Sequence, residues 1–215
     1  MSEKYLSTVA TVTQELNSPA RNQEKLALLS RALRWHRDYD AEDMAALTDL
    51  AQMVRDQPDA EAWNVEQAIL ETLCDQARVE HVPFLVETFR RRTPGKHSND
   101  RRRLALQALS GVAARTNNEE ALQILAEGLS HYKKDTRGWS IGFLLDTYHY
   151  LDRSLPPAVI DRLHHLVDHD VSGDVRVEAI TALAALGLAD QKEVEAVVIL
   201  AQRGQKGSAQ DEEAA

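Results

Sequence analysis

A pair of helical segments recurs along this chain at nearly constant spacing. The shorter segment of each pair carries an aliphatic residue at intervals of 38, 37, 38 and 37 residues, namely at Leu47, Leu85, Leu122, Ile160 and Val197. Three positions later, four of the five residues are Leu. The longer segments agree where they are clearest, at a separation of 74 residues (Ala105 with Ala179, Leu109 with Leu183). A helix pair that repeats at this length is typical of a solenoid, in which each pair buries its apolar face against the next.

The clearest of the longer segments is Ser172–Gly187. Its apolar residues recur at helical spacing, and small Ala alternates with larger Ile and Leu, so that a neighbouring helix can approach closely. Arg176 stands in the first turn, and Gly187 follows the last periodic residue as a C-terminal stop. One such helix cannot bury its apolar face alone. The repetition therefore predicts a fold, but it names neither a partner nor a reaction.

The same reasoning predicts eleven helices with short connections and no strand. The expected helices, or the apolar runs that mark them, are Ser2–Leu16, Arg21–Trp35, Met44–Val54, Val65–Leu73, Val82–Phe89, Ala105–Val112, Ala121–Leu129, Trp139–Tyr148, Val159–Val167, Asp174–Gly187 and Val194–Leu200. Several helix starts are expected from capping residues or proline: Asp40 with Asp43, Ser98 or Asn99, Asn117 with Glu120, Asp135, Pro156-Pro157, and Asp190 with Glu193.

Composition places the chain among ordinary globular proteins. Of its 215 residues, 43% are hydrophobic and 27% charged, and only nine are Gly and six Pro, which argues against an all-β fold. No apolar run approaches the ~18 residues of a membrane span, and the N-terminus lacks the apolar core of a secretory signal. A lone Cys74 excludes an intramolecular disulfide. We expect a cytoplasmic protein with one domain over residues 1–203 and a disordered acidic tail over 204–215.

The net charge of −9 argues against general attraction to nucleic acid or to anionic membranes. This average conceals a local asymmetry. Residues Ala41–Glu87 carry a balance of −9, whereas Arg90–Arg103 carry a balance of +6. An acidic segment followed by a basic loop is either a binding device or surface charge that happens to cluster.

These residues resemble the HEAT repeat, in the bacterial form related to the phycobilin-lyase repeat. The pattern D-V-R-x-x-A-x-x-A-L-x-x-L-G is present over Asp174–Gly187, Asp100–Val112 give a looser copy, and Arg137 marks a degenerate third. The resemblance covers residues 20–203. It implies an all-α fold, a right-handed α–α superhelix of about five helix pairs, with Ser2–Leu16 as an N-terminal cap helix. It further implies a scaffold whose second helices line a concave surface that binds other macromolecules.

One basic constellation is a candidate binding site. Equivalent positions of successive repeats stack roughly one helix diameter apart, ~10 Å, which would set Arg residues at the starts of the inner helices in a row near an aromatic side chain. Such a row could track phosphates. Alternatively, first-turn Arg residues pair with acids of the preceding turn and lock the repeats together. The candidate binding residues are Arg101, Arg102, Arg103, Lys134, Arg137, Trp139 and Arg176.

No pattern in the sequence indicates catalysis or a cofactor. There is no nucleophile elbow and no phosphate-binding Gly loop. Asp161, His165 and His169 share one helix face, as metal ligands could, but this face lies opposite the apolar stripe and we expect it to be exposed to solvent and free of metal. Cys74 is expected to be a small core residue.

The sequence therefore predicts a non-enzymatic protein-binding scaffold or adaptor whose partner is another protein, bound on the concave face. The alternative is a nucleic-acid or phosphate binder that uses the basic loop of residues 90–103. A further alternative is an accessory enzyme of the bilin-lyase branch of the family. Partner identity, pathway and oligomeric state do not follow from the sequence.

Overall fold

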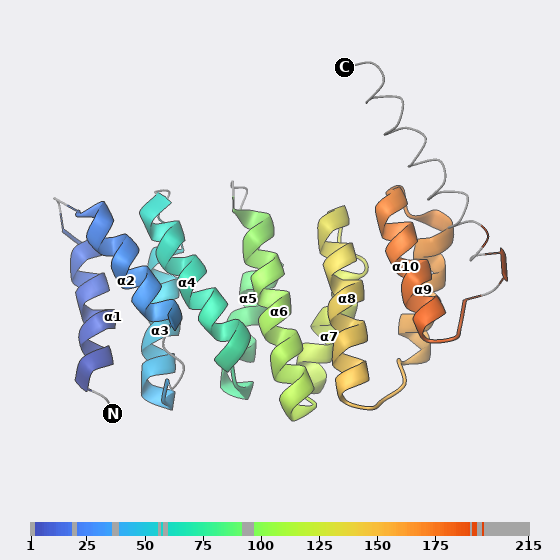
Figure 1. Ribbon diagram of the computed structural model, residues 1–215, viewed down its shortest axis with the longest axis horizontal. Coiled ribbons are helices and arrows are strands. Elements are labelled where there is room, and N and C mark those ends of the chain that lie inside the picture. Colours follow the sequence, from blue (N-terminus) through green and yellow to red (C-terminus); the bar gives the residue numbers. More distant parts are fainter. Residues whose placement is uncertain are drawn as a thin grey trace, which may run out of the picture. The chain divides into compact units, whose positions relative to one another are not determined.

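The computed structural model describes residues 3–18, 21–35, 39–55, 57, 60–91, 97–189, 191–192 and 195. Within these ranges the chain is all-α, with ten α-helices, one short 3-10 helix and no strand (Figure 1). The elements are α1 (Glu3–Leu16), α2 (Gln23–Trp35), α3 (Ala41–Val54), α4 (Ala60–Gln76), η1 (Val79–His81), α5 (Val82–Arg90), α6 (Ser98–Thr116), α7 (Glu119–Gly128), α8 (Lys134–Tyr150), α9 (Pro157–His169) and α10 (Gly173–Ala185).

The chain divides into two compact units, residues 1–124 and 125–215, with the boundary inside α7. In the first unit, α4 packs against both α2 and α6, and these three helices form one layer. Figure 1 shows α3 and α5 behind this layer, where α3 contacts α4 and α5 contacts α6. In the second unit, α10 packs against both α8 and α9.

The aliphatic residues that define the period of the sequence lie in the core. Leu47, Leu85 and Leu122 are each at most 3% exposed, and Ile160 is half-buried. Small residues let α6 approach α4 closely, since a Cβ on Gly111 would lie 3.0 Å from the carbonyl oxygen of Cys74. The alternation of small and large apolar residues in the sequence thus corresponds to close helix packing.

Two predicted helix starts and one predicted helix end agree with the structure. The carboxylate of Asp40 accepts hydrogen bonds from the N–H groups of Glu42 and Asp43, as expected of an N-cap. Pro156 precedes α9 and Pro157 is its first residue. Gly187 follows α10 with a φ of +68°, a conformation that glycine adopts without strain.

Three predicted helix starts are wrong. Asp135 lies inside the first turn of α8, where Lys133 occupies the N-cap position without a side-chain hydrogen bond. The amide oxygen of Asn118, and not Asn117, accepts the hydrogen bond from the N–H of Ala121 at the start of α7. Asn117 instead ends α6 in the left-handed conformation, with a φ of +52°. At the start of α6, His97 occupies the N-cap position without a side-chain hydrogen bond, and Ser98 is the first helical residue. All three differences are shifts of one or two residues at a helix end.

Some expectations lie outside the described residues. These are the capping pair Asp190 and Glu193, the helix expected over Val194–Leu200 and the tail over 204–215. The expectation of one domain over residues 1–203 stays a prediction. Among the described residues, no helix combines the length and apolar character that crossing a membrane requires.

His81 gives the first unit a pH-dependent stability. The side chain is 4% exposed, and its Nδ1 accepts a hydrogen bond from the N–H of Arg78. Burial lowers the pKa of His81, while the carbonyl of Arg78 acts in the opposite direction. The unfolded chain therefore binds a proton at higher pH than the folded chain does. The free energy of unfolding should therefore be highest above the ordinary histidine pKa of about 6.5. We expect it to decline as the pH falls below that value.

Urea unfolding at a series of pH values checks this prediction. His81→Asn keeps an acceptor for Arg78 and removes the titrating ring, so it should reduce the loss of stability between about pH 7 and 5. His165→Asn, at an exposed position, should leave the pH dependence unchanged. Equal pH profiles for the wild type and His81→Asn would contradict the assignment.

Candidate functional site

Arg101 belongs to an interhelical contact of the first unit. Its Nε donates to both carboxylate oxygens of Glu66 on α4, at 2.9 and 2.8 Å, and its Nη2 donates to one of them at 2.6 Å. The guanidinium also lies 5.0 Å from the centre of the Trp63 ring. Glu66 is 1% exposed, so the carboxylate of this ion pair is buried. Arg101 thus ties α6 to α4.

Arg102 is 3% exposed and stabilises the chain at the start of α6. Its guanidinium donates to the carbonyl oxygens of Arg91 and Ser98, at 3.2 and 3.4 Å. The burial removes this side chain from the surface that a ligand could reach. Of the rest of the basic loop, residues 92–96 lie outside the described residues.

Arg137 forms a comparable ion pair in the second unit. Its Nε and Nη2 donate to the two carboxylate oxygens of Asp170, at 2.6 and 2.8 Å, and its Nη1 donates to the carbonyls of His131 and Tyr132. Burial alone would raise the pKa of Asp170, but the hydrogen bonds from Arg137 and from the N–H of Ser172 outweigh it and lower the pKa. Arg137 thus joins the segment before α8 to the segment before α10.

The remaining predicted site residues of the second unit do not share a common partner. Lys134 is exposed and forms an ion pair with Asp174 at 3.1 Å. Trp139 is half-buried on α8. Arg176 donates from Nη1 to the carbonyl oxygen of Asp170 at 3.4 Å. These contacts favour the structural interpretation of the first-turn arginines, whereas a binding role for Lys134 and Trp139 stays a prediction.

The buried pair of Arg137 and Asp170 predicts a large effect of one substitution. Asp170→Asn keeps the shape of the side chain but leaves the Arg137 charge buried without its partner. We expect a loss of about 3–5 kcal/mol in the free energy of unfolding. The same pair loses its contribution as the pH falls through the lowered pKa of Asp170, below the ordinary aspartate value of about 3.9.

Chemical denaturation of the two Asn variants provides the comparison. Asp174→Asn is the matched control, because Asp174 pairs with Lys134 at the surface, and it should cost at most about 1 kcal/mol. Equal effects of Asp170→Asn and Asp174→Asn would show that burial does not distinguish the two ion pairs.

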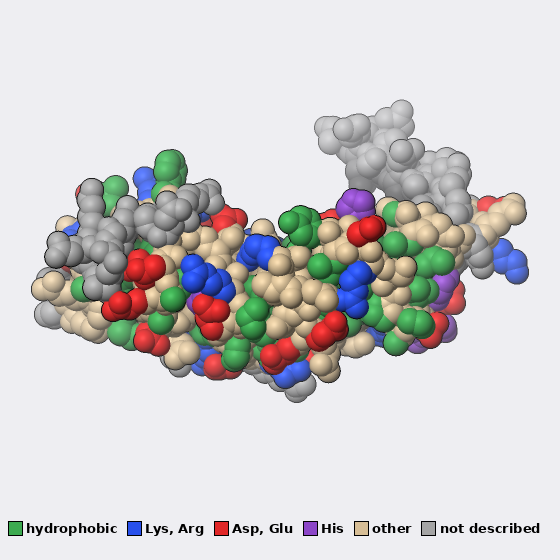
Figure 2. Space-filling model, turned by 90° about the horizontal axis from the view of Figure 1, so that it is seen from below, with side chains coloured by type: hydrophobic (Ala, Val, Ile, Leu, Met, Phe, Trp, Pro, Cys, Tyr) green, Lys and Arg blue, Asp and Glu red, His purple; other side chains and the backbone are tan. Residues whose placement is uncertain are grey.

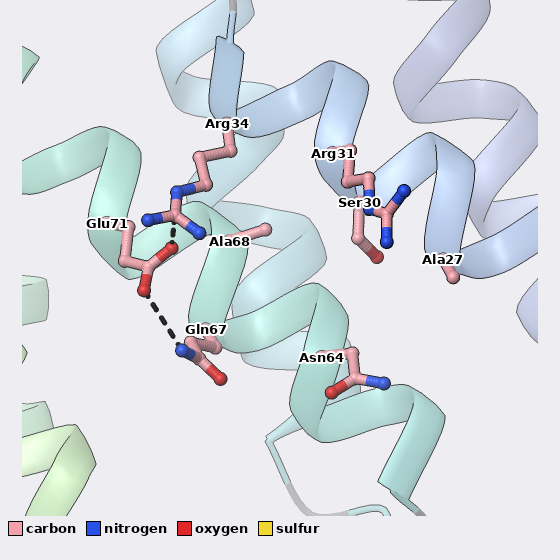
Figure 3. Close-up of a pocket in the computed structure, with 8 residues that line it drawn as sticks. All are labelled: Ala27, Ser30, Arg31, Arg34, Asn64, Gln67, Ala68 and Glu71. Atoms are coloured by element: carbon pink, nitrogen blue, oxygen red, sulfur yellow. Dashed lines mark hydrogen bonds and ion pairs between the residues drawn. The ribbon is translucent and has the colours of Figure 1, made fainter.

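A groove runs along α4 in the first unit. Its first part lies between α2 and α4, with a volume of about 240 Å³. Figure 3 shows Arg34 on α2 directed toward Glu71 on α4, with Gln67 on the other side of the same carboxylate. The Arg34–Glu71 ion pair measures 2.9 Å, and Gln67 donates to Glu71 at 2.9 Å. The lining residues are Ala27, Ser30, Arg31, Arg34, Asn64, Gln67, Ala68 and Glu71.

A second cavity continues the groove toward α6, with a volume of about 400 Å³. It shares Arg34 and Glu71 with the first cavity, so their ion pair lies at the junction of the two. The other lining residues are Cys74, Asp75, Arg103, Leu104 and Gln107. We refer to the two cavities together as the α4 groove. Of the predicted site residues, the structure places Arg103 alone in this groove.

Charge in the α4 groove is mixed, but its unpaired charge is positive. Glu71 is held by Arg34 and Gln67. Within the described part of the chain, Arg31 and Arg103 form neither an ion pair nor a hydrogen bond through their side chains. Acidic and basic side chains are also interspersed over the face that Figure 2 shows. The groove therefore offers two available cations among side chains that are otherwise mostly polar or paired.

Most groove residues were missed at the sequence level. Asn64, Gln67, Glu71 and Asp75 follow one another at spacings of three and four on α4, opposite its buried face. A polar stripe of this kind is the signal that could have identified them. It was not distinctive, because every amphipathic helix has a polar face.

Cys74 lines the α4 groove but is chemically protected. Its thiol donates a weak hydrogen bond to the carbonyl of Leu104 at 3.5 Å. Burial raises the pKa of Cys74 to about 12, and the Asp75 charge adds to the effect. Because the thiolate is the reactive form, we expect a thiol reagent such as a disulfide dye to react with the native chain at least about a hundredfold more slowly than with the unfolded chain at neutral pH. Rapid native labelling would contradict this.

The histidine-rich face of α9 is exposed at His165 and His169, as expected. The rings of these two residues stack at a centroid distance of 4.6 Å, and Nδ1 of His169 lies 3.2 Å from the carbonyl of His165. No group of three or more potential ligands that could hold a metal ion occurs among the described residues.

No protein-family model matches the chain, and a search of curated proteins finds no match.

Proposed function

We propose that this chain is a non-enzymatic protein-binding scaffold of the HEAT-like solenoid type. The two-layer packing of the first unit supports this assignment, since α2, α4 and α6 follow one another in one layer. Burial of Leu47, Leu85 and Leu122 at positions one period apart supports it as well. In such a scaffold the α4 groove belongs to the surface of the second helices. Its ligand is an extended, acidic segment of a partner protein.

One observation carries the choice of an acidic ligand. Arg31 lines one part of the α4 groove and Arg103 lines the other, and neither has a partner among the described residues. Glu71, which could neutralise them, is already held by Arg34. A ligand with carboxylates spaced along an extended chain would meet both cations. Interfaces pair surfaces of opposite potential, which favours such a partner over a basic one.

The uncharged groove residues suit a polypeptide main chain. Asn64 and Gln107 make no side-chain hydrogen bond within the described residues, so their amides are available as donors and acceptors. Ala27 and Ala68 are small and leave room for a chain to lie close to the helices. Side-chain amides can pair with the N–H and C=O groups of an extended segment, which otherwise would lose their hydrogen bonds to water.

A nucleic acid suits this groove less well. Phosphate tracking needs a row of cations, and binding of single strands adds aromatic side chains on which bases stack. The residues that line the α4 groove include no aromatic side chain, and the cation Arg34 is paired with Glu71.

Fluorescence anisotropy with defined peptides tests the proposal. The probe is a fluorescein-labelled peptide of alternating Glu and Gly-Ser units, and the comparison is its Lys counterpart. The double variant Arg31→Glu/Arg103→Glu should weaken binding of the acidic peptide about tenfold or more, because two attractions become repulsions. The Lys peptide should not bind the wild type.

The control is Lys133→Glu/Lys192→Glu, which changes the net charge equally at two exposed positions of the second unit. It should leave the affinity for the acidic peptide within about twofold. An equal loss of affinity in both double variants would show that the effect depends on net charge alone. Tighter binding of a single-stranded oligonucleotide, with a steep salt dependence, would favour the nucleic-acid alternative and overturn the proposal.

A further inference from the structure

The exposed face of α2 carries two large apolar side chains beside the α4 groove. Leu28 is 63% exposed and Trp35 is 78% exposed. They are seven residues apart, so they lie on one face of the helix, about 10 Å apart along its axis. The core takes the opposite face, where Leu26 and Leu33 are each 1% exposed. Leu28 and Trp35 therefore form one apolar surface that is open to solvent, which we call the α2 patch.

The α2 patch borders the first part of the α4 groove. Ala27 and Arg34, which are the chain neighbours of Leu28 and Trp35, both line this part. The patch thus follows the groove along two turns of α2, from Ala27 to the junction that Arg34 and Glu71 form. A ligand that lies in the groove therefore passes beside both apolar side chains.

Arg31 lies between the two apolar residues and is available to a ligand. It is exposed, three residues after Leu28 and four before Trp35, which places it on the same side of α2. Figure 3 shows its side chain extending away from Glu71, whereas Arg34 is directed toward that carboxylate. Arg31 forms no ion pair or hydrogen bond through its side chain within the described residues. The α2 patch is therefore apolar at both ends, with a positive charge between them.

The other two helices of the layer present a polar surface. α4 and α6, whose residues all belong to the described part of the chain, expose no large apolar side chain. Arg103, the second available cation of the α4 groove, lies on α6 and lines the other cavity. The groove is therefore asymmetric. An apolar surface borders its α2 end, and an available cation lines its α6 end.

We infer that the acidic segment bound in the α4 groove carries a pair of apolar side chains at one end, which cover Leu28 and Trp35. Tryptophan is enriched at the energetically important positions of interfaces, because its ring buries a large apolar area. Carboxylates of the segment meet Arg31 and, farther along the groove, Arg103. This inference rests on the proposed function, and it adds the composition and the order of the ligand: apolar residues at one end and acidic residues after them.

A second copy of this chain suits the α2 patch less well. Most homodimers are two-fold symmetric, so that the same surface of both copies meets in the contact. Arg31 lies near the middle of the patch, between Leu28 and Trp35. Two-fold contact of two α2 helices through the patch would therefore bring two Arg31 charges together, which is unfavourable. The charge of Arg31 favours a partner that supplies a carboxylate at this point.

Fluorescence anisotropy with two kinds of labelled peptide tests the inference. The first is the acidic peptide of alternating Glu and Gly-Ser units. The second has the same length and number of Glu residues, with two Leu residues three positions apart at one end, because three residues of extended chain span about 10 Å. It is made in two forms, with the Leu pair at the N-terminal or the C-terminal end. We expect one form to bind the wild type about tenfold or more tighter than the Gly-Ser peptide.

The double variant Leu28→Ala/Trp35→Ala should remove this gain and leave the affinity for the Gly-Ser peptide within about twofold. Both positions are exposed and Ala favours helix, so the fold is kept. The matched control is Tyr150→Ala/Val171→Ala, which removes two apolar side chains of the second unit that are 70% and 95% exposed. It should keep the gain. Equal affinity of the wild type for all peptides, or a gain that survives in Leu28→Ala/Trp35→Ala, would overturn the inference.

The outcomes separate this inference from the proposed function. If the Gly-Ser peptide binds through Arg31 and Arg103 but the Leu pair adds no affinity, the proposed function stands and the inference alone fails. If no peptide binds, both fail. Sedimentation that shows a dimer of the wild type, lost in Leu28→Ala/Trp35→Ala, would assign the α2 patch to a second copy. Binding to phosphatidylcholine vesicles that is lost in the same variant would assign it to a membrane surface, and either result would overturn the inference.

Discussion

Buried ion pairs between an arginine near the start of one helix and a carboxylate of another element determine what surface this protein can offer. Arg101 with Glu66 and Arg137 with Asp170 each join segments about one repeat apart, at separations of 35 and 33 residues. Each pair lets a charged side chain lie among packed helices, since every charge has its partner. Arg31 and Arg103, which have no partner among the described residues, are then available for ligands. Whether an arginine is held in a buried ion pair, more than the total charge of the chain, determines whether it stabilises the fold or can bind a ligand.

The helices could be predicted from the sequence, because apolar spacing is a local signal. Asp40, Pro157 and Gly187 act as their residue types suggest. The fate of each arginine could not be predicted in the same way. Arg101, Arg102 and Arg103 are adjacent, yet one binds Glu66, one is buried against carbonyl groups and one lines a groove. Which of these applies depends on residues that lie far away in the sequence.

The arginines of the first unit serve in different ways. In the α4 groove, Arg31 and Arg103 lack partners among the described residues and suit the carboxylates of an extended polypeptide. Arg55 and Arg101, by contrast, are oriented by the carboxylates of Glu87 and Glu66. A flexible cation favours adaptable binding of a chain, whereas a guanidinium fixed by a carboxylate joins two helices.

The most direct test of this account is NMR observation of the arginine Nε–H groups, assigned by single Arg→Lys variants. Arg101 and Arg137 donate from Nε to buried or nearly buried carboxylates. Their signals should be separate and exchange slowly with water, whereas Arg31 and Arg103 should give averaged, rapidly exchanging signals. Slow exchange at Arg31 and Arg103 together with fast exchange at Arg101 and Arg137 would contradict the division into structural and available arginines.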